Sequence, residues 1–382
     1  MVVLALAAVL AVAAVIVYWS WRHGPEHDLS GKVVLLTGAG GGLGRLLAED
    51  LAARGCRLAC VDVAEGPNEE TASMVRAHGQ ANTTKLLARA YTVDLRNGED
   101  ISALVESVVN DFGQVDILVN CAGQLQAGAV WELTDDQTDQ LLDVNLRACI
   151  LLVKYALPHM RARGEGHIVT VGSVAAIFAT RKMSVYAASK AGLSRFMQCL
   201  YFDLRRDGLG DKIHVTTIEP YLINTLPHLE ASFKSRRPVA KLLLGYLEAK
   251  ATARTICHCI ATRQHLVTLP AHLGVLANIL RHTPWTVQAY VLEKLARPDK
   301  RPPYPYHARH ASLDAALMYE LLSKGYDLHE DPEAVCRALR AENLAKGIAL
   351  PHDYSPFRQS IRKFYSSRGQ SVPDAVKSVF AL

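Results

Sequence analysis

The chain has 382 residues, half of them hydrophobic, and a formal net charge of +5 at pH 7. This length suits one large α/β domain with an appendage, and the composition excludes a mainly disordered protein. The basic residues are scattered, which argues against a nucleic-acid partner, and the eight cysteines lack the spacing of a disulfide scaffold or a zinc site, so we expect no bound metal.

The first predicted element is an apolar run of 18 residues without a charge, over residues 2–19. Its length matches a helix that crosses a bilayer, and the aromatic residues near its end suit the membrane interface. A cleaved signal peptide is the alternative, but no basic residue precedes the run. We therefore expect a membrane anchor over residues 1–21. Because Arg22 and Lys32 follow it, the positive-inside rule places the remaining chain in the cytosol.

From residue 30 to residue 270, short β-branched runs alternate with amphipathic segments of helical length. This alternation predicts an α/β domain of the Rossmann type, in which helices cover both faces of a doubly wound parallel sheet. The seven predicted strands span residues 33–37, 57–62, 90–94, 116–120, 167–172, 213–218 and 265–269.

Three further segments follow the predicted sheet. Residues 271–296 are apolar but interrupted by Arg281, His282 and Pro284, so we expect them either to associate with a membrane interface or to pack against the sheet. Residues 297–310 are rich in proline and cations, which predicts a linker. Residues 311–382 predict a helical C-terminal extension whose role the sequence does not indicate.

A glycine-rich turn, TGAGGGLG from Thr37, separates the first predicted strand from the helix after it. The glycines Gly38, Gly42 and Gly44 let the backbone turn tightly and approach a pyrophosphate. The helix that begins near Leu43 directs its amide groups and the positive end of its dipole at that anion. This strand, turn and helix predict a dinucleotide site.

The choice of dinucleotide depends on Asp62, which ends the second predicted strand. A carboxylate at this place accepts hydrogen bonds from the adenosine ribose and repels the 2′-phosphate of NADP. Gly41 precedes Gly42, so no cation stands there to neutralise that phosphate. The sequence therefore favours NAD over NADP, and Arg45 is the one nearby cation that argues the other way.

The order of the motifs resembles the short-chain dehydrogenase/reductase superfamily over roughly residues 30–270. The motifs are TGAGGGLG from Thr37, VDL from Val93, NCAG from Asn120, VNL from Val144, Ser173, and YAASK from Tyr186. The chain is most similar to membrane-anchored retinol dehydrogenases and related 17β-hydroxysteroid dehydrogenases, in NEETASMVRAHG from Asn68, GHIVTVGS from Gly166 and EPYLINT from Glu219. Two positions depart from the family pattern: Cys121 replaces an asparagine, and Tyr221 replaces a glycine after Pro220.

The resemblance implies a catalytic set of Ser173, Tyr186, Lys190 and Asn145. Oxidation of an alcohol requires removal of the hydroxyl proton, and a free tyrosine, with a pKa of about 10, is a weak base at neutral pH. An ammonium group one helical turn away, at Lys190, favours the tyrosinate. By the same resemblance Lys190 would hold the nicotinamide ribose, Ser173 would bond the substrate oxygen, and Asn145 would order a water in the proton relay.

The resemblance also assigns the remaining site residues. Those expected to bind the cofactor are Thr37, Gly38, Gly42, Leu43, Gly44, Asp62, Asp94, Leu95, Asn120, Ala122, Gly123, Tyr186, Lys190, Pro220, Ile223 and Thr225. Those expected to bind the substrate are Ser173, Tyr186 and Tyr221.

The expected function is an NAD-dependent interconversion of a lipophilic alcohol and its carbonyl, with all-trans-retinol and retinal as the expected pair. A 17β-hydroxysteroid or long-chain alcohol is the alternative substrate, and a catalytically silent membrane or lipid-droplet scaffold is the alternative of another class. The resemblance further implies a place on the endoplasmic reticulum membrane with the catalytic domain facing the cytosol, lipid droplets as a second location, and pairing into a homodimer.

Overall fold

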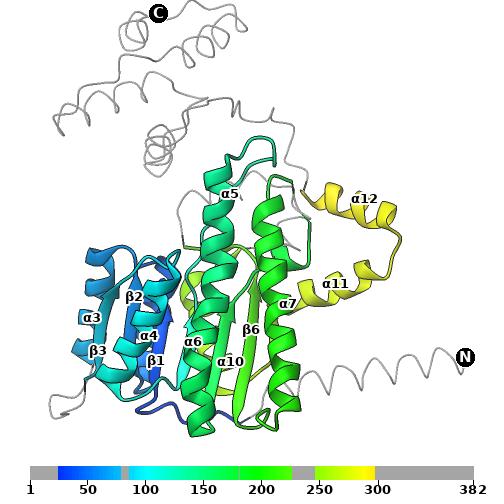
Figure 1. Ribbon diagram of the computed structural model, residues 1–382. Helices are drawn as coiled ribbons and strands as arrows, with labels where there is room; N and C mark the ends of the chain where they lie inside the picture. The colour runs from blue at the N-terminus through cyan, green and yellow to red at the C-terminus, as the bar shows by residue number, and fades with distance from the viewer. Residues whose placement is uncertain (1–24, 79–85, 180, 226–245, 297–382) are drawn as a thin grey trace, which may run out of the picture. The chain divides into compact units, whose positions relative to one another are not determined.

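A computed structural model of the protein describes residues 25–78, 86–179, 181–225 and 246–296 (Figure 1). All of these residues belong to one compact unit. The predicted membrane anchor, linker and C-terminal extension lie outside the described residues. Among the helices that are described, none combines the length and apolarity needed to cross a bilayer.

The unit is built around a parallel sheet of seven strands in the order β3-β2-β1-β4-β5-β6-β9. The strands are β1 (Val33–Thr37), β2 (Arg57–Asp62), β3 (Ala88–Thr92), β4 (Ile117–Asn120), β5 (Gly166–Val171), β6 (Ile213–Pro220) and β9 (Leu266–Leu269). The chain winds outward from β1 to β3 and then from β4 to β9, so the order reverses between β1 and β4. This confirms the predicted doubly wound sheet, in which ligands bind at the carboxyl ends of the strands beside that reversal.

Two strand boundaries differ from the prediction. β3 covers Ala88–Thr92 instead of residues 90–94, because Asp94 starts a turn in which its carboxylate accepts a hydrogen bond from the Arg96 amide. β6 extends two residues further than predicted, and its last residue, Pro220, is aligned with Leu269 of β9. The other strands agree with the prediction within one residue.

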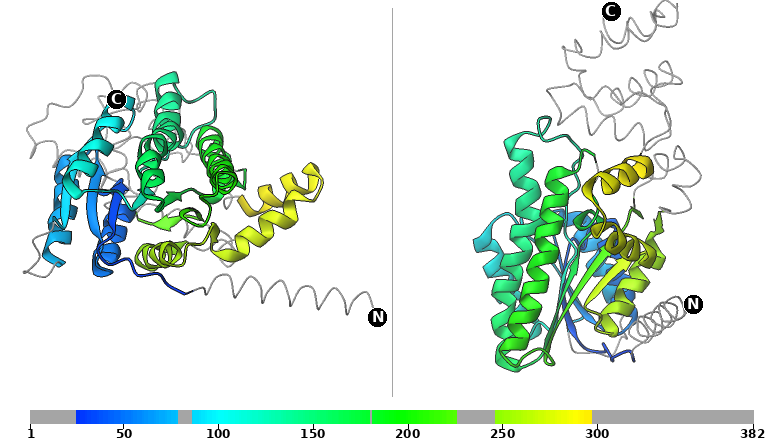
Figure 2. Two further views of the ribbon diagram at one scale, coloured as in Figure 1. Left: turned by 60° about the horizontal axis from the view of Figure 1, so that its bottom comes forward. Right: turned by 90° about the vertical axis from the view of Figure 1, so that its right-hand side faces the viewer.

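Helices cover both faces of the sheet (Figure 2). One face carries α2 (Gly42–Ala53), α3 (Glu65–His78) and α10 (Ala249–Ala261), and the other carries α4 (Gly98–Phe112), α6 (Ala148–Arg163) and α7 (Ser184–Arg206). The side chains of β1 alternate between the two cores: Val34 and Leu36 pack with the first group of helices, and Val33 and Leu35 with the second. Both cores are therefore anchored on β1, whose residues are fully buried.

Shorter elements complete the unit. They are α5 (Asp135–Leu142), a π-helical turn η1 (Asp143–Arg147), a 3-10 turn η2 (Val174–Ala176), the two-stranded pair of β7 (Ile223–Asn224) and β8 (Leu247–Glu248), and the helices α11 (Ala271–Arg281) and α12 (Trp285–Ala296). α5, η1 and α6 follow one another without a break in the helical backbone. A π turn inside a helix is often found at a functional site, and η1 contains Asn145.

Candidate active site

The glycine-rich turn joins β1 to α2 at the carboxyl edge of the sheet. Gly38 has a φ of 70°, and a Cβ there would lie 2.9 Å from the backbone of Ala122, so only glycine fits this turn. A Cβ at Gly44 would overlap the carbonyl oxygen of Gly38. Gly42 begins α2 and is exposed, as is Gly41 before it. The turn therefore brings exposed backbone and the amino end of α2 together, as a phosphate site requires.

Asp62, at the end of β2, faces the same turn. Its two carboxylate oxygens each accept a backbone hydrogen bond of 3.0 Å, one from Gly40 and one from Ala64. These bonds fix the carboxylate beside the glycine-rich turn and leave lone pairs for a ribose hydroxyl. Asp62 thus lies next to the glycine-rich turn.

Arg45 is turned toward α3. Its guanidinium donates to the Thr71 hydroxyl, to the Pro67 carbonyl and to the Glu70 carboxylate. It does not line the cleft that contains Asp62. The cation that argued for NADP in the sequence therefore has its donors directed at α3.

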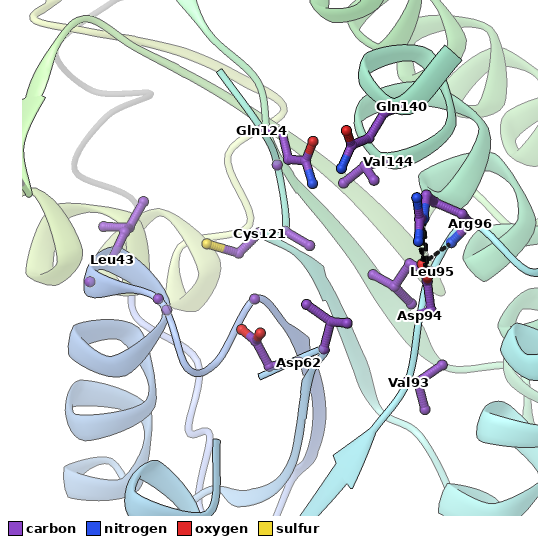
Figure 3. A pocket seen from close by; sticks show the side chains of 17 residues that line it. Leu43, Asp62, Val93, Asp94, Leu95, Arg96, Cys121, Gln124, Gln140 and Val144 are labelled. Atoms are coloured by element: carbon purple, nitrogen blue, oxygen red, sulfur yellow. Dashed lines mark hydrogen bonds and ion pairs between the residues drawn. The ribbon is translucent and has the colours of Figure 1, made fainter. Parts of the chain in front are cut away.

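A cleft of about 360 Å³ extends from the glycine-rich turn across the carboxyl edge of the sheet (Figure 3). Nine of its lining residues belong to the predicted cofactor set: Gly38, Gly42, Leu43, Gly44, Asp62, Asp94, Leu95, Ala122 and Gly123. In Figure 3, Asp62, the Asp94–Arg96 pair and Gln140 face the cleft from different elements. The volume lies within the range of small-molecule and cofactor sites, and the lining extends from the glycine-rich turn to Val144 in the π turn η1.

One side wall of the cleft is formed by the turn after β3. Two nitrogens of the Arg96 guanidinium, Nε and Nη2, donate hydrogen bonds to the Asp94 carboxylate. These hydrogen bonds hold the pKa of Asp94 below its usual range. The Leu95 side chain between them is buried. Asp94 is thus a fixed acceptor at the position where the resemblance places the adenine.

The floor of the cleft lies after β4. The buried Thr37 hydroxyl accepts hydrogen bonds of 3.1 Å from the amides of both Cys121 and Ala122, which ties the end of β1 to the end of β4. Burial raises the pKa of the Cys121 thiol to about 12, so this cysteine stays protonated. Asn120 donates to the Thr170 hydroxyl, and its buried Oδ1 has no partner. Cys121 therefore fills the family's asparagine position with a neutral side chain.

Asn145 is buried in the π turn and bridges three elements. Its Oδ1 accepts from the Gln124 amide at 2.7 Å, and its Nδ2 donates to the Gln124 carbonyl at 2.9 Å and to the Ser189 hydroxyl at 3.3 Å. The side chain thus joins the loop after β4 to α7. A Cβ at Gly123 would stand 3.3 Å from both Asn145 Oδ1 and Lys190 Nζ, so these two groups converge on the end of the cleft.

Lys190 and Tyr186 lie one turn apart on α7, as predicted. The Lys190 side chain is only 4 % exposed, and its Nζ donates to the carbonyl of Val171 at the end of β5 at 3.1 Å. Nζ also lies 5.9 Å from the centre of the Tyr186 ring. Lys190 thus holds a buried ammonium group close to the Tyr186 ring.

Ser173 follows β5 and caps the 3-10 turn η2, where its hydroxyl accepts a hydrogen bond from the Ala175 amide at 3.1 Å. η2 packs against α7, the helix that carries Tyr186. Ser173 therefore begins a turn that packs against the helix carrying Tyr186 and Lys190, and none of these three residues lines the cleft itself.

The segment after β6 carries the last predicted residues. Tyr221 donates its amide to the Leu269 carbonyl, and Ile223 lies in β7. Thr225 reaches the glycine-rich turn, because a Cβ at Gly42 would lie 3.3 Å from the Thr225 Cβ. Thr225 thus lies beside Gly42 of the glycine-rich turn, but neither it nor Pro220, Tyr221 or Ile223 lines the cleft.

Several cleft residues are absent from the predicted set. They are Gly41, Val63, Val93, Arg96, Cys121, Gln124, Gln140 and Val144. Gln124 directly follows the NCAG motif, and Arg96 lies two residues after Asp94, so proximity to a motif is the signal that would have found them. Val144 begins the VNL motif, so the same signal applies to it, whereas Gln140 has no such signal in the sequence.

The polar segment Cys257-His258-Cys259 lies on α10. Both cysteines are buried, and the exposed His258 contacts Glu26. Across the described ranges, no three His, Cys, Asp or Glu residues are grouped as metal ligands.

Comparison with known proteins identifies relatives of one kind. The profile of the family described as short chain dehydrogenase matches residues 32–234. Epidermal retinol dehydrogenase 2 of Mus musculus is 31% identical over 250 residues, which are 65% of this chain and 77% of that protein. Retinol dehydrogenase 10-A of Danio rerio is 33% identical over 231 residues, or 56% of this chain and 68% of that protein.

A solved structure is also similar. It is a short chain dehydrogenase/reductase from Burkholderia phymatum in complex with NAD, with a TM-score of 0.58 and 26% identity. The match covers 72% of this chain and 99% of the bacterial one. The shared region therefore includes the sheet and the cleft described above.

Proposed function

Because the chain belongs to the short-chain dehydrogenase family, and is therefore an alcohol oxidoreductase of that type, we propose that it uses NAD to interconvert a lipophilic alcohol and its carbonyl, with retinol and retinal as the substrate pair. The observation that carries the proposal is the convergence of Lys190 and Asn145 on Gly123, where the cleft ends beside the helix that bears Tyr186.

The residues of the cleft fit NAD. Gly38, Gly42 and Gly44 leave room for a pyrophosphate, and the fixed Asp62 carboxylate is placed for the adenosine ribose. NAD is preferred to NADP because Asp62 would repel a 2′-phosphate and Arg45 is engaged by Glu70 and Pro67. When bound, NAD would supply the acceptor for the hydride that leaves the alcohol carbon.

The protein's own groups handle the proton. The tyrosinate form of Tyr186 accepts the hydroxyl proton of the substrate and becomes neutral, and the Lys190 ammonium, 5.9 Å from the ring centre, stabilises that tyrosinate before the transfer. Ser173 orients the substrate oxygen toward Tyr186. Asn145, held on both sides by Gln124, fixes the loop against α7 so that this geometry is set before substrate arrives.

The substrate class is supported by the surroundings of the site. The loop after β4 exposes Leu125, Val130 and Trp131, with Trp131 84 % accessible. Gly128 of this loop donates to the Lys182 carbonyl, only four residues before Tyr186. A loop with exposed apolar side chains that contacts the segment just before Tyr186 suits a lipid alcohol better than a hydrophilic one. In addition, two relatives are named retinol dehydrogenases.

We further propose that residues 1–21 anchor the protein in the endoplasmic reticulum membrane, with residues 30–270 in the cytosol. The uncharged run of 18 residues and the basic residues after it support this placement. An anchor keeps the site near a substrate that is dissolved in the bilayer.

The test is a substrate panel on membranes that carry the full chain. Retinol, estradiol and a long-chain alcohol are each offered with NAD and with NADP, and Tyr186→Phe serves as the inactive control. We expect NADH formation with retinol and none from the Tyr186→Phe protein. Faster turnover of estradiol or of the long-chain alcohol would replace retinol as substrate. Equal cofactor binding by both proteins without turnover of any alcohol would instead support a silent scaffold.

A further inference from the structure

Exposed hydrophobic residues are concentrated in the last part of the described chain, from β9 to α12. Of the twelve large hydrophobic side chains that are exposed among the described residues, six lie on β9, α11 and α12. They are Leu266, Val275, Ile279, Trp285, Val287 and Tyr290. In Figure 1 and the left view of Figure 2, α11 and α12 extend outward from the side of the unit where α7 lies. A concentration of this kind marks a surface that meets an apolar partner.

The two sides of α11 have different surroundings. Leu273, Ala277 and Leu280 follow a helical spacing and are buried, and α11 packs against β9. Val275 and Ile279, one turn apart on another side of the helix, are 56 % and 59 % exposed. Packing against the sheet, one of the two expectations for residues 271–296, therefore explains only one side of this helix.

α12 is still less enclosed. None of the side chains described for it, from Trp285 to Leu292, is buried, and its main neighbour among the described elements is α11. Trp285 is 66 % exposed and Tyr290 63 %. Tryptophan and tyrosine are the residues that favour the boundary between lipid and water.

The charge of this part of the sequence indicates which apolar partner it meets. Residues 265–310 contain six lysines and arginines against two acidic residues, and four of these cations lie directly after α12, in residues 297–310, outside the described residues. Two copies of such a segment would repel each other, whereas acidic phospholipids would attract it. We propose that α11 and α12 dock on the surface of a bilayer that contains acidic phospholipids, in addition to the N-terminal anchor.

This docking surface begins next to the site. The Tyr221 amide donates to the Leu269 carbonyl at 2.6 Å, and the next residue, Pro270, caps α11. A bilayer on α11 and α12 would thus lie close to Tyr221, which the resemblance places at the substrate. This last step rests on the proposed function, whereas the docking itself does not.

The experiment measures where Trp285 lies when the full chain is on a membrane. Trp19→Phe, Trp21→Phe and Trp131→Phe leave Trp285 as the only tryptophan. The protein is added to vesicles of phosphatidylcholine, with or without phosphatidylserine, that carry brominated acyl chains. We expect a blue-shifted emission that bromine quenches, with quenching that grows with phosphatidylserine and shrinks with salt. Unquenched emission in every vesicle would overturn the proposal, even if the anchor binds.

A pair of matched variants tests the surface. Val275→Glu with Ile279→Glu places charge on the exposed side of α11, and Phe202→Glu places it on an equally exposed position of α7. We expect the α11 variant to lose Trp285 quenching and the α7 variant to keep it. Quenching that both variants keep would contradict docking by this side of α11, and a second copy would show itself as concentration-dependent association without lipid.

Activity separates this inference from the proposed function. If Trp285 is quenched but no lipid alcohol is turned over, the docking stands and the proposed function fails. If retinol is turned over without quenching, the docking fails alone. If both hold, the α11 variant should raise the KM for retinol dissolved in vesicles at least severalfold, with little change in kcat.

Discussion

The two ends of the seven-stranded sheet are built in opposite ways. At the carboxyl ends, glycines expose backbone to a cleft of about 360 Å³. At the amino ends, a second cavity measures only about 30 Å³, and most of its lining residues carry charged or imidazole side chains. Those side chains are His27, Asp28, Lys32, Asp116, Glu165, His167, His214 and Arg263.

Asp116 shows how the amino end is closed. Its buried carboxylate accepts from the Val33 amide at 2.7 Å and from Gln114 at 2.8 Å, and it pairs with Arg163 at 3.2 Å. It thereby links the beginnings of β1 and β4 to the end of α6. The same strands thus hold a site at one end and a closed hydrogen-bond network at the other, so stability and chemistry can be altered separately.

The sharpest test of this separation removes the buried ammonium at the carboxyl end. Lys190→Met keeps the side chain's length but removes its charge near Tyr186, so kcat/KM should fall by about 10²- to 10⁴-fold. The free energy of unfolding should change little, because a buried charge is replaced by an apolar group. Kinetics and urea unfolding measure the two effects, with the exposed Lys154→Met as control. A large loss of stability with normal kinetics would break the comparison.

The converse change is Asp116→Ala at the amino end. It leaves the Val33 amide and the Arg163 guanidinium without their acceptor and should lower the free energy of unfolding by about 2–3 kcal/mol. The KM for NAD should stay the same, since the cleft lies at the other end of the sheet. Asp207→Ala, in an exposed ion pair with Arg161, should cost under about 1 kcal/mol in urea unfolding. A changed KM for NAD would show that the two ends are coupled.

The sequence predicted the carboxyl end of the sheet better than the amino end. The β-branched strands, the TGAGGGLG turn and the Tyr186–Lys190 pair are local patterns, and local patterns can be read along the chain. The bridge from Asn145 to Gln124 depends on the π turn of η1, for which the sequence has no signal. The sequence alone did not show whether Arg45 could bind the 2′-phosphate of NADP, because its contact with Glu70 forms only when α2 and α3 pack together. Contacts between distant elements were therefore the part that sequence reasoning missed.

A smaller effect concerns cofactor choice at the carboxyl end. Asp62→Ala removes the acceptor for the ribose and the repulsion of a 2′-phosphate, so the ratio of kcat/KM for NAD to that for NADP should fall about 10- to 100-fold. Glu65→Ala, at the exposed start of α3, is the control. An unchanged ratio would mean that another group selects the cofactor.

The smallest predicted effect is a pH dependence that originates at the amino end. Burial, with a smaller contribution from Arg263, lowers the pKa of His214 to about 4, and burial lowers that of its neighbour His167 as well. Below pH 6.5 these two histidines bind protons in the unfolded chain but stay neutral in the folded protein. The free energy of unfolding should therefore fall as the pH drops from 6.5 toward 4.

His214→Gln isolates this contribution. Because His214 is partly exposed, we expect the variant to lose about 1 kcal/mol less than the parent between pH 7 and pH 5. Urea unfolding at each pH measures the difference, and at pH 8 the His214 charge should contribute nothing to it. Parallel stability curves for the two proteins would place the acid sensitivity elsewhere. A kcat/KM profile that is the same in both would show that the titration at this end does not reach Tyr186 at the other.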